Sequence, residues 1–75
     1  MNEYTVLLTW DAEARVWVAE NDDIPIALES GSFDTLIERV RYTVPEILQE
    51  NDKSTDEYLN FITHRREKVY PDGGI

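Results

Sequence analysis

The N-terminal part of the chain carries the two-residue period of β-strands. In the first run, Tyr4, Val6, Leu8 and Trp10 alternate with Thr5, Leu7 and Thr9. This alternation predicts a strand over residues 4–10. The polar segment 11–15 separates it from a β-branched and aromatic run over 16–20, so the two runs predict an antiparallel hairpin. A third strand over 26–30 follows Pro25, which cannot donate to a strand ladder and therefore favours an edge position.

The period then changes to the three- and four-residue steps of a helix. The apolar stripe consists of Phe33, Leu36, Ile37, Val40, Val44, Ile47 and Leu48. Ser32 is the predicted N-cap, and Asp34 lies where the helix dipole favours negative charge. Pro45 falls inside the stripe, where it removes the hydrogen bond to the carbonyl of Arg41. Because the stripe continues beyond it, we expect a kink rather than a stop.

A fourth strand is predicted over residues 57–66, with Leu59 and Phe61 on one face and Tyr58 and Ile62 on the other. The helix between the third and fourth strands must cover one face of the sheet. A right-handed crossover then lets the last strand lie parallel beside the first. The predicted fold is α+β, with the element order β-β-β-α-β and one helix on a four-stranded mixed sheet of order 3-2-1-4. The other face of the sheet is left without a helix.

No repeat, linker or low-complexity segment divides the chain, which predicts a single domain over residues 1–75. We expect an ordered core over about 3–66 and a loose tail over 67–75.

The faces of the two tryptophans depend on the register of the first hairpin. If the loop is Asp11–Arg15, Trp10 pairs with Val16, and Trp17 points to the opposite face. If the loop is one residue longer, the tryptophans pair across the strands. We favour the first register. It places Val6, Leu8, Trp10, Val16 and Val18 under the helix, and Leu7, Trp17 and Ala19 on the open face.

The chain is acidic, and its acidity is concentrated in the N-terminal half. The net charge is -9, and residues 1–31 hold seven acids against Arg15 alone. Such a field repels phosphate backbones and attracts basic partners. With no cysteine there is no disulfide framework and no thiolate nucleophile. The start of the chain lacks the cationic and apolar segments of a signal peptide or membrane span, which predicts a cytoplasmic protein without membrane contact.

The segment TWDAEARVWVAENDDIPIALESGSFDTLIERVRYTVPEILQEN resembles the short HicB-like bacterial proteins. The resemblance covers roughly residues 4–50. It consists of a Trp-Asp hairpin, a VWVA strand, an acid-acid-aliphatic-Pro corner, and a small-residue turn opening an LxERV...PELL-type helix. It implies a partial RNase H-like fold, as in the antitoxins of toxin-antitoxin pairs, whose partner is a small basic ribonuclease toxin of the HicA type.

Two features depart from that family pattern. Ile26 stands where glycine commonly follows the corner proline. Full antitoxins also carry a C-terminal DNA-binding segment, which residues 67–75 cannot form. We therefore expect no direct contact of this domain with nucleic acid.

The residues do not form a recognisable catalytic constellation. Two-metal phosphodiester cleavage requires a carboxylate in the middle of the first strand, and none lies between Tyr4 and Trp10. The lone His64 has no positioned nucleophile or acid beside it. The basic cluster Arg65, Arg66 and Lys68 lacks interleaved aromatic residues and is better explained as a guard against edge-to-edge aggregation. We expect a non-enzymatic protein without cofactor or metal.

The candidate site is a partner-binding surface around the acidic corner. Its residues are Trp17, Glu20, Asp22, Asp23, Ile24 and Pro25. The acids would steer a basic toxin, and the extended Ile24-Pro25 segment would dock it. The same Asn and Asp residues also suit an ordinary turn. The alternative function is an orphan homodimeric structural or regulatory unit, with the open face buried against a second copy and no toxin partner.

Overall fold

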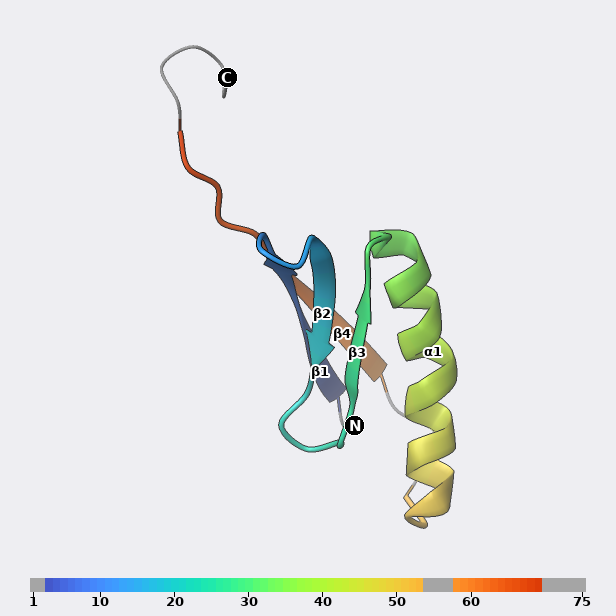
Figure 1. Ribbon diagram of the computed structural model, residues 1–75. Coiled ribbons are helices and arrows are strands. Elements are labelled where there is room, and N and C mark those ends of the chain that lie inside the picture. Colours follow the sequence, from blue (N-terminus) through green and yellow to red (C-terminus); the bar gives the residue numbers. More distant parts are fainter. Residues whose placement is uncertain (1–2, 54–57, 70–75) are drawn as a thin grey trace.

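The computed structural model describes residues 3–53 and 58–69, which form a four-stranded sheet with one helix on one face (Figure 1). In chain order the elements are β1 (Glu3–Asp11), β2 (Val16–Glu20), β3 (Ala27–Ser30), α1 (Phe33–Glu50) and β4 (Tyr58–His64). The strand order is β3-β2-β1-β4, with β1 antiparallel to β2 and parallel to β4. The predicted α+β fold, element order and strand order are confirmed.

The element bounds differ from the prediction by small amounts. β1 extends one residue further at each end than 4–10, and β3 begins at Ala27 rather than at residue 26. β4 ends at His64, two residues before the predicted end. The predicted start of this strand at residue 57 and the tail residues 70–75 lie outside the described part of the chain.

Helix α1 begins at the predicted cap and buries the predicted stripe. The Ser32 hydroxyl accepts a hydrogen bond from the Thr35 amide at 3.3 Å, which satisfies one of the free donors of the first turn. The fully buried positions of the helix are Leu36, Val40, Val44 and Leu48. They recur at four-residue steps and face the sheet. The helix continues past Pro45 to Glu50, so the proline does not stop it.

The C-terminal end of α1 is closed by a Schellman arrangement. The Lys53 amide donates to the Leu48 carbonyl at 2.8 Å, and the Asp52 amide donates to the Gln49 carbonyl at 3.2 Å. Asp52 adopts φ 53° at the position where glycine is usual. The Asn51 side chain adds a bond to the Ile47 carbonyl at 2.8 Å. The carbonyls of Ile47, Leu48 and Gln49 in the last turn are thus satisfied.

The favoured register of the first hairpin is wrong. Trp10 pairs with Trp17 and Asp11 pairs with Val16, so the two tryptophans lie on the same face. The connecting loop is Ala12–Arg15. The Asp11 carboxylate closes it by accepting two amide hydrogen bonds within the loop, each at 3.1 Å, and Arg15 enters β2 with φ 56°. Side-chain capture of loop amides by Asp11 favours this tight loop over the predicted one.

The consequence is that Trp17 belongs to the core. Only 9% of its surface is exposed, and its ring meets Phe33 of the helix edge-on at 4.9 Å between centroids. Ala19 is also buried on this face, whereas Val16 and Val18 lie half-buried on the opposite face. All four residues of the VWVA run are apolar, so alternation alone could not decide which pair faces the helix.

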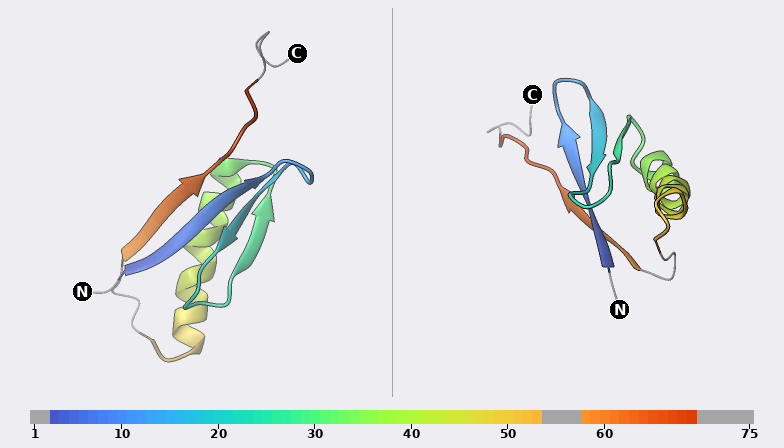
Figure 2. Two further views of the ribbon diagram at one scale, coloured as in Figure 1. Left: turned by 90° about the vertical axis from the view of Figure 1, so that its left-hand side faces the viewer. Right: turned by 90° about the horizontal axis from the view of Figure 1, so that it is seen from below.

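The helix backbone packs beside β3 and β2 rather than over the whole sheet. Figure 2 shows β4 on the other side of β1 from these strands, and the described tail residues 65–69 lead away from the sheet. Leu59 and Phe61 of β4 lie half-buried against the core, whereas Tyr58 and Ile62 are exposed on the other face. The predicted faces of β4 are confirmed.

Candidate functional site

The acidic corner between β2 and β3 is organised by one side chain, Asn21. Its Oδ1 accepts hydrogen bonds from the amides of Asp23 and Ile24, both at 2.7 Å. Its Nδ2 donates to the carbonyl of Thr5 on β1 at 2.6 Å. The Ile26 amide donates to the Ile24 carbonyl at 2.7 Å, which makes a tight turn about Pro25. The corner is therefore a locally bonded loop that is also hydrogen-bonded to the inner strand β1.

The structure exposes some of the predicted partner-binding residues and buries the others. Glu20, Asp22, Asp23 and Pro25 are exposed. Ile24 is only 2% exposed and belongs to the core together with Ile26. Ile26 is thus an additional buried side chain at the position where the resemblance leads one to expect glycine. Trp17 and Ile24 support the surface from beneath, so their side chains are not available to a partner in this conformation.

A small cavity of about 80 Å³ lies between the corner and the end of the helix. Its lining residues are Asp23, Ile24, Pro25, Ile47, Leu48, Asn51 and Lys53. Pockets for drug-sized ligands occupy roughly 300–1,000 Å³. The corner can accept a small side chain or water, and it is too small to enclose a metabolite.

The sheet face opposite the helix is the larger accessible surface, and we call it the open face. The register places on it Glu3, Thr5, Leu7, Thr9, Asp11, Val16, Val18, Glu20, Ala27, Glu29, Tyr58, Asn60, Ile62 and His64. Leu7 and Ile62 pair across β1 and β4 and are 40% and 47% exposed, which makes an apolar centre. Tyr58, 57% exposed, extends it along β4.

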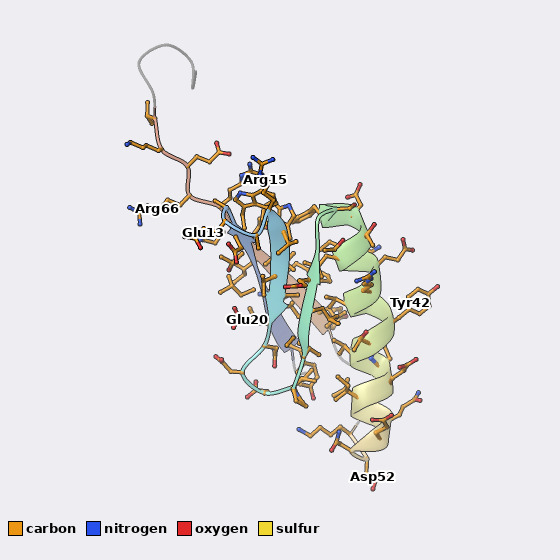
Figure 3. The ribbon with its side chains drawn as sticks, viewed as in Figure 1. Glu13, Arg15, Glu20, Tyr42, Asp52 and Arg66 are labelled. Atoms are coloured by element: carbon orange, nitrogen blue, oxygen red, sulfur yellow. The ribbon has the colours of Figure 1, made fainter. Side chains whose placement is uncertain are left out.

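Carboxylates surround this apolar centre. Glu20 pairs directly with Leu7, and Glu29 pairs with Val18 on the neighbouring strand. Figure 3 shows Glu20 on the side of the sheet away from α1. Among the described residues, the register places no lysine or arginine of the strands on the open face. The open face therefore combines exposed apolar side chains with one sign of charge.

A shallow depression of about 470 Å³ lies at the hairpin end of this region. Its lining residues are Thr9, Trp10, Asp11, Ala12, Glu13, Val18 and Glu20. Three of these residues are acids, so the depression suits a cationic side chain of a partner better than an anion. The sequence predicted the open face and placed Leu7 on it correctly, but it also placed Trp17 and Ala19 there, and the structure buries both and leaves Leu7 with Ile62 as the exposed apolar centre.

Asp11 and His64, the other side chains considered for catalysis or metal binding, have structural positions. Asp11 closes the hairpin loop, and His64 ends β4 on the open face opposite Thr9. In the described ranges 3–53 and 58–69, no three His, Asp or Glu side chains converge as they would around a metal ion. Within the same ranges, no helix is long and apolar enough to cross a membrane.

The two arginines after β4 differ in their contacts. The Arg65 guanidinium lies over Trp10 at 4.4 Å from the ring centroid and forms an ion pair with Glu67 at 2.8 Å. Arg66 is exposed and lies on the segment that leads away from the sheet (Figure 3). Arg65 therefore has a role in packing, in addition to its charge.

Comparison with known proteins shows the family of the chain. The model of the family described as domain of unknown function DUF1902 matches residues 3–71. The chain belongs to the DUF1902 family. A solved structure, a hypothetical protein from the extremely thermophilic bacterium Thermus thermophilus, is similar to this DUF1902 chain with 31% sequence identity and a TM-score of 0.69. That similarity covers 92% of this chain and 99% of the other. No curated protein matches the chain.

Proposed function

We propose that this DUF1902 chain is a non-enzymatic protein-binding module that holds a small basic protein on its open face, as an antitoxin holds a ribonuclease toxin. The single observation that carries the proposal is the composition of that face: exposed Leu7 and Ile62 lie among carboxylates without a neighbouring base in the described strands. The HicB-like order of motifs in the sequence supports an antitoxin-type partner.

The partner's chemistry follows from this combination of charge and apolar surface. The exposed acids Glu20, Asp22 and Asp23 lie at the end of β2 and at the corner beside it. They would raise the association rate of a basic protein and make that rate dependent on salt. Leu7 and Ile62 would then be desolvated at the centre of the contact, where most of the binding energy of an interface arises. A basic ribonuclease of the HicA type has this chemistry.

The alternative, in which the open face is buried against a second copy of itself, is less well supported. A two-fold contact would bring Glu20 and Glu29 toward the same carboxylates of the other copy. Like charges held in an interface cost free energy unless a cation lies between them. An acidic face is better matched by a basic partner.

The experiment measures inhibition and binding kinetics with a purified HicA-type ribonuclease from the same host. We expect stoichiometric inhibition of RNA cleavage. We also expect Asp22→Lys with Asp23→Lys to slow association by about tenfold at low salt and to reduce its salt dependence. Leu7→Asp should mainly accelerate dissociation. Glu38→Lys with Glu46→Lys, which reverses two exposed charges on the helix side, is the matched control and should change neither rate substantially. Unchanged RNA cleavage at molar excess would refute the proposal.

A further inference from the structure

The outer edge of β4 is uncovered. The basic residues predicted to guard it, Arg65, Arg66 and Lys68, follow His64, where the strand ends, and so do not lie along this edge. β4 pairs with β1 along seven residues, and nothing within the described ranges pairs with its other side. Natural sheet edges are commonly blunted by lysine, proline, a bulge or a covering element. The six residues Tyr58–Thr63 include no charged residue, no proline and no glycine. This edge therefore has the composition of a strand that accepts another strand.

The opposite edge of the sheet is different. β3 has only four residues, and it follows Pro25. Helix α1 packs beside it, and the Arg39 side chain donates to the Glu29 carbonyl at 3.2 Å. A short strand covered by a helix offers little room for strand addition. Of the two edges, β4 is the accessible one.

The helix also leaves the apolar residues of β4 incompletely covered. Leu59 and Phe61 point to the helix side and are only half-buried, because the helix backbone lies beside β3 and β2 (Figure 2). A strand added beside β4 would bury more of both side chains while pairing the backbone groups of the edge. Backbone pairing and apolar burial thus favour the same position.

We propose that a second copy of this chain occupies this edge, with the two β4 strands antiparallel about a two-fold axis at Phe61. Phe61 then faces its counterpart on the helix side, and Asn60 faces Ile62 of the other copy on the open face. The two four-stranded sheets become one continuous sheet. Both helices lie on one side, and the two open faces lie together on the other.

The charge along this edge fits a second copy of the chain. The chain carries a net charge of -9, so most of its surfaces repel another copy, whereas the strand from Tyr58 to Thr63 is uncharged. Opposite charges lie near the two ends of the edge. Arg66 follows β4 at one end, and Glu3 of β1, one strand in from the edge, lies beside Tyr58 at the other. An antiparallel arrangement brings the basic end of each copy toward the acidic end of its partner, as a two-fold contact requires.

The proposal is tested with the chain alone by sedimentation or light scattering from micromolar to millimolar concentration. We expect the mass to approach twice the 8.8 kDa of one chain. The combined substitution Asn60→Lys with Ile62→Lys puts like charges directly opposite each other across the proposed axis. It should weaken association at least about tenfold. It also reduces the net negative charge, so general repulsion between copies cannot explain such a loss. Circular dichroism verifies that the variant is folded.

Leu7→Lys is the matched control, because Leu7 lies beside Ile62 on the open face but one strand in from the edge. It should leave the dimer intact. A second readout uses the absence of cysteine from the chain. Asn60→Cys with Ile62→Cys should yield a covalent dimer on mild oxidation. A monomer at every concentration would overturn the proposal. So would a dimer that Leu7→Lys dissociates and the lysine pair does not. Neither outcome depends on a basic partner, so the proposed function is judged separately.

Discussion

The guanidinium carbon of Arg65 lies 4.4 Å from the centre of the Trp10 ring, just beyond the end of β4. The same group is 5.7 Å from the Trp17 ring, so one cation caps the tryptophan pair that fixes the hairpin register. A cation over an aromatic face contributes about 0.5–1 kcal/mol at an exposed site. The contact thereby fastens the end of β4 to the hairpin.

Arg65→Ala should lower the free energy of unfolding by about 0.5–1 kcal/mol. It should also move tryptophan emission to longer wavelength, because the half-buried Trp10 becomes more hydrated. Chemical denaturation and fluorescence measure the two effects. Arg66→Ala is the control, since Arg66 is exposed and lies beyond the ring contacts. Equal effects of the two substitutions would contradict the role of Arg65. The ion pair with Glu67 contributes little because both side chains are largely exposed.

Trp17 gives a sharper test of the register. Because it is 9% exposed and packs on Phe33, Trp17→Ala should cost about 3–5 kcal/mol, a large share of the stability of so small a domain. Trp17→Phe should cost less. Thermal and denaturant unfolding provide the measurement. Tyr42→Ala removes an aromatic residue that is 71% exposed on the outer side of α1 and should change stability little (Figure 3). If Trp17→Ala did not lower the free energy of unfolding, Trp17 would not belong to the core, and the result would support the register predicted from the sequence.

The sequence determines the elements more firmly than it determines the faces. The period change after Ser30 and the Ser32 cap place α1 without ambiguity, because a helical stripe and a strand alternation cannot be satisfied by the same residues. The strand order follows from the short meander and the single crossover. In β2, by contrast, Val16 and Val18 are apolar like Trp17 and Ala19, and only Glu20 at the end of the strand distinguishes the two alternating sets. The register therefore depended on the local turn in which Asp11 accepts from the amides of Glu13 and Ala14, and the alternation of the strands does not reveal that turn.

The candidate site was predictable to a similar extent. The exposed acids Glu20, Asp22 and Asp23 follow from turn chemistry and charge. The burial of Ile24 does not, because the tight turn at Pro25 reverses the direction that an extended Ile-Pro segment suggests. The signal for Asn21 was present in the sequence: an Asn followed by two Asp residues is typical of an Asx turn. Its bond to Thr5, sixteen residues away, could come only from the fold.

Asn21 should therefore matter more to stability than its exposed acidic neighbours. Asn21→Ala removes an acceptor for two loop amides and a donor to the Thr5 carbonyl, so we expect a loss of about 1–3 kcal/mol in the free energy of unfolding. Asp22→Ala is the matched control, because its side chain is exposed and outside these bonds. Denaturant unfolding measures the free energy of unfolding of both variants, and an equal loss in the two would contradict the role of Asn21.

A second substitution at the same position separates the two functions of the side chain. Asn21→Asp keeps the acceptor for the amides of Asp23 and Ile24 but replaces the donor to Thr5 with a carboxylate oxygen. We expect a loss of stability at neutral pH that is recovered in part when the new carboxyl is protonated and can donate again. Identical stability of Asn21 and both variants would show that the corner is held by Pro25 and the buried isoleucines instead.

We expect that replacing Asp52 can increase the stability of the chain. It adopts φ 53° after the last turn of α1, a conformation that costs an L-residue roughly 1 kcal/mol relative to glycine. Its negative charge also lies at the negative end of the helix dipole. Asp52→Gly relieves both effects while keeping the backbone bonds to Gln49 and Leu48. We expect the free energy of unfolding to rise by about 1 kcal/mol.

Two further variants divide this gain between its causes. Asp52→Asn removes the charge and keeps a side chain that tolerates the left-handed region, so its gain should be about 0.3–1 kcal/mol and should diminish in high salt. Asp52→Ala removes the same charge but keeps the steric cost, and should gain less than glycine. Since Asp23→Gly introduces glycine where φ is not positive, it should be neutral or destabilising. A gain from Asp23→Gly equal to that from Asp52→Gly would mean that backbone strain at the helix end is not the cause.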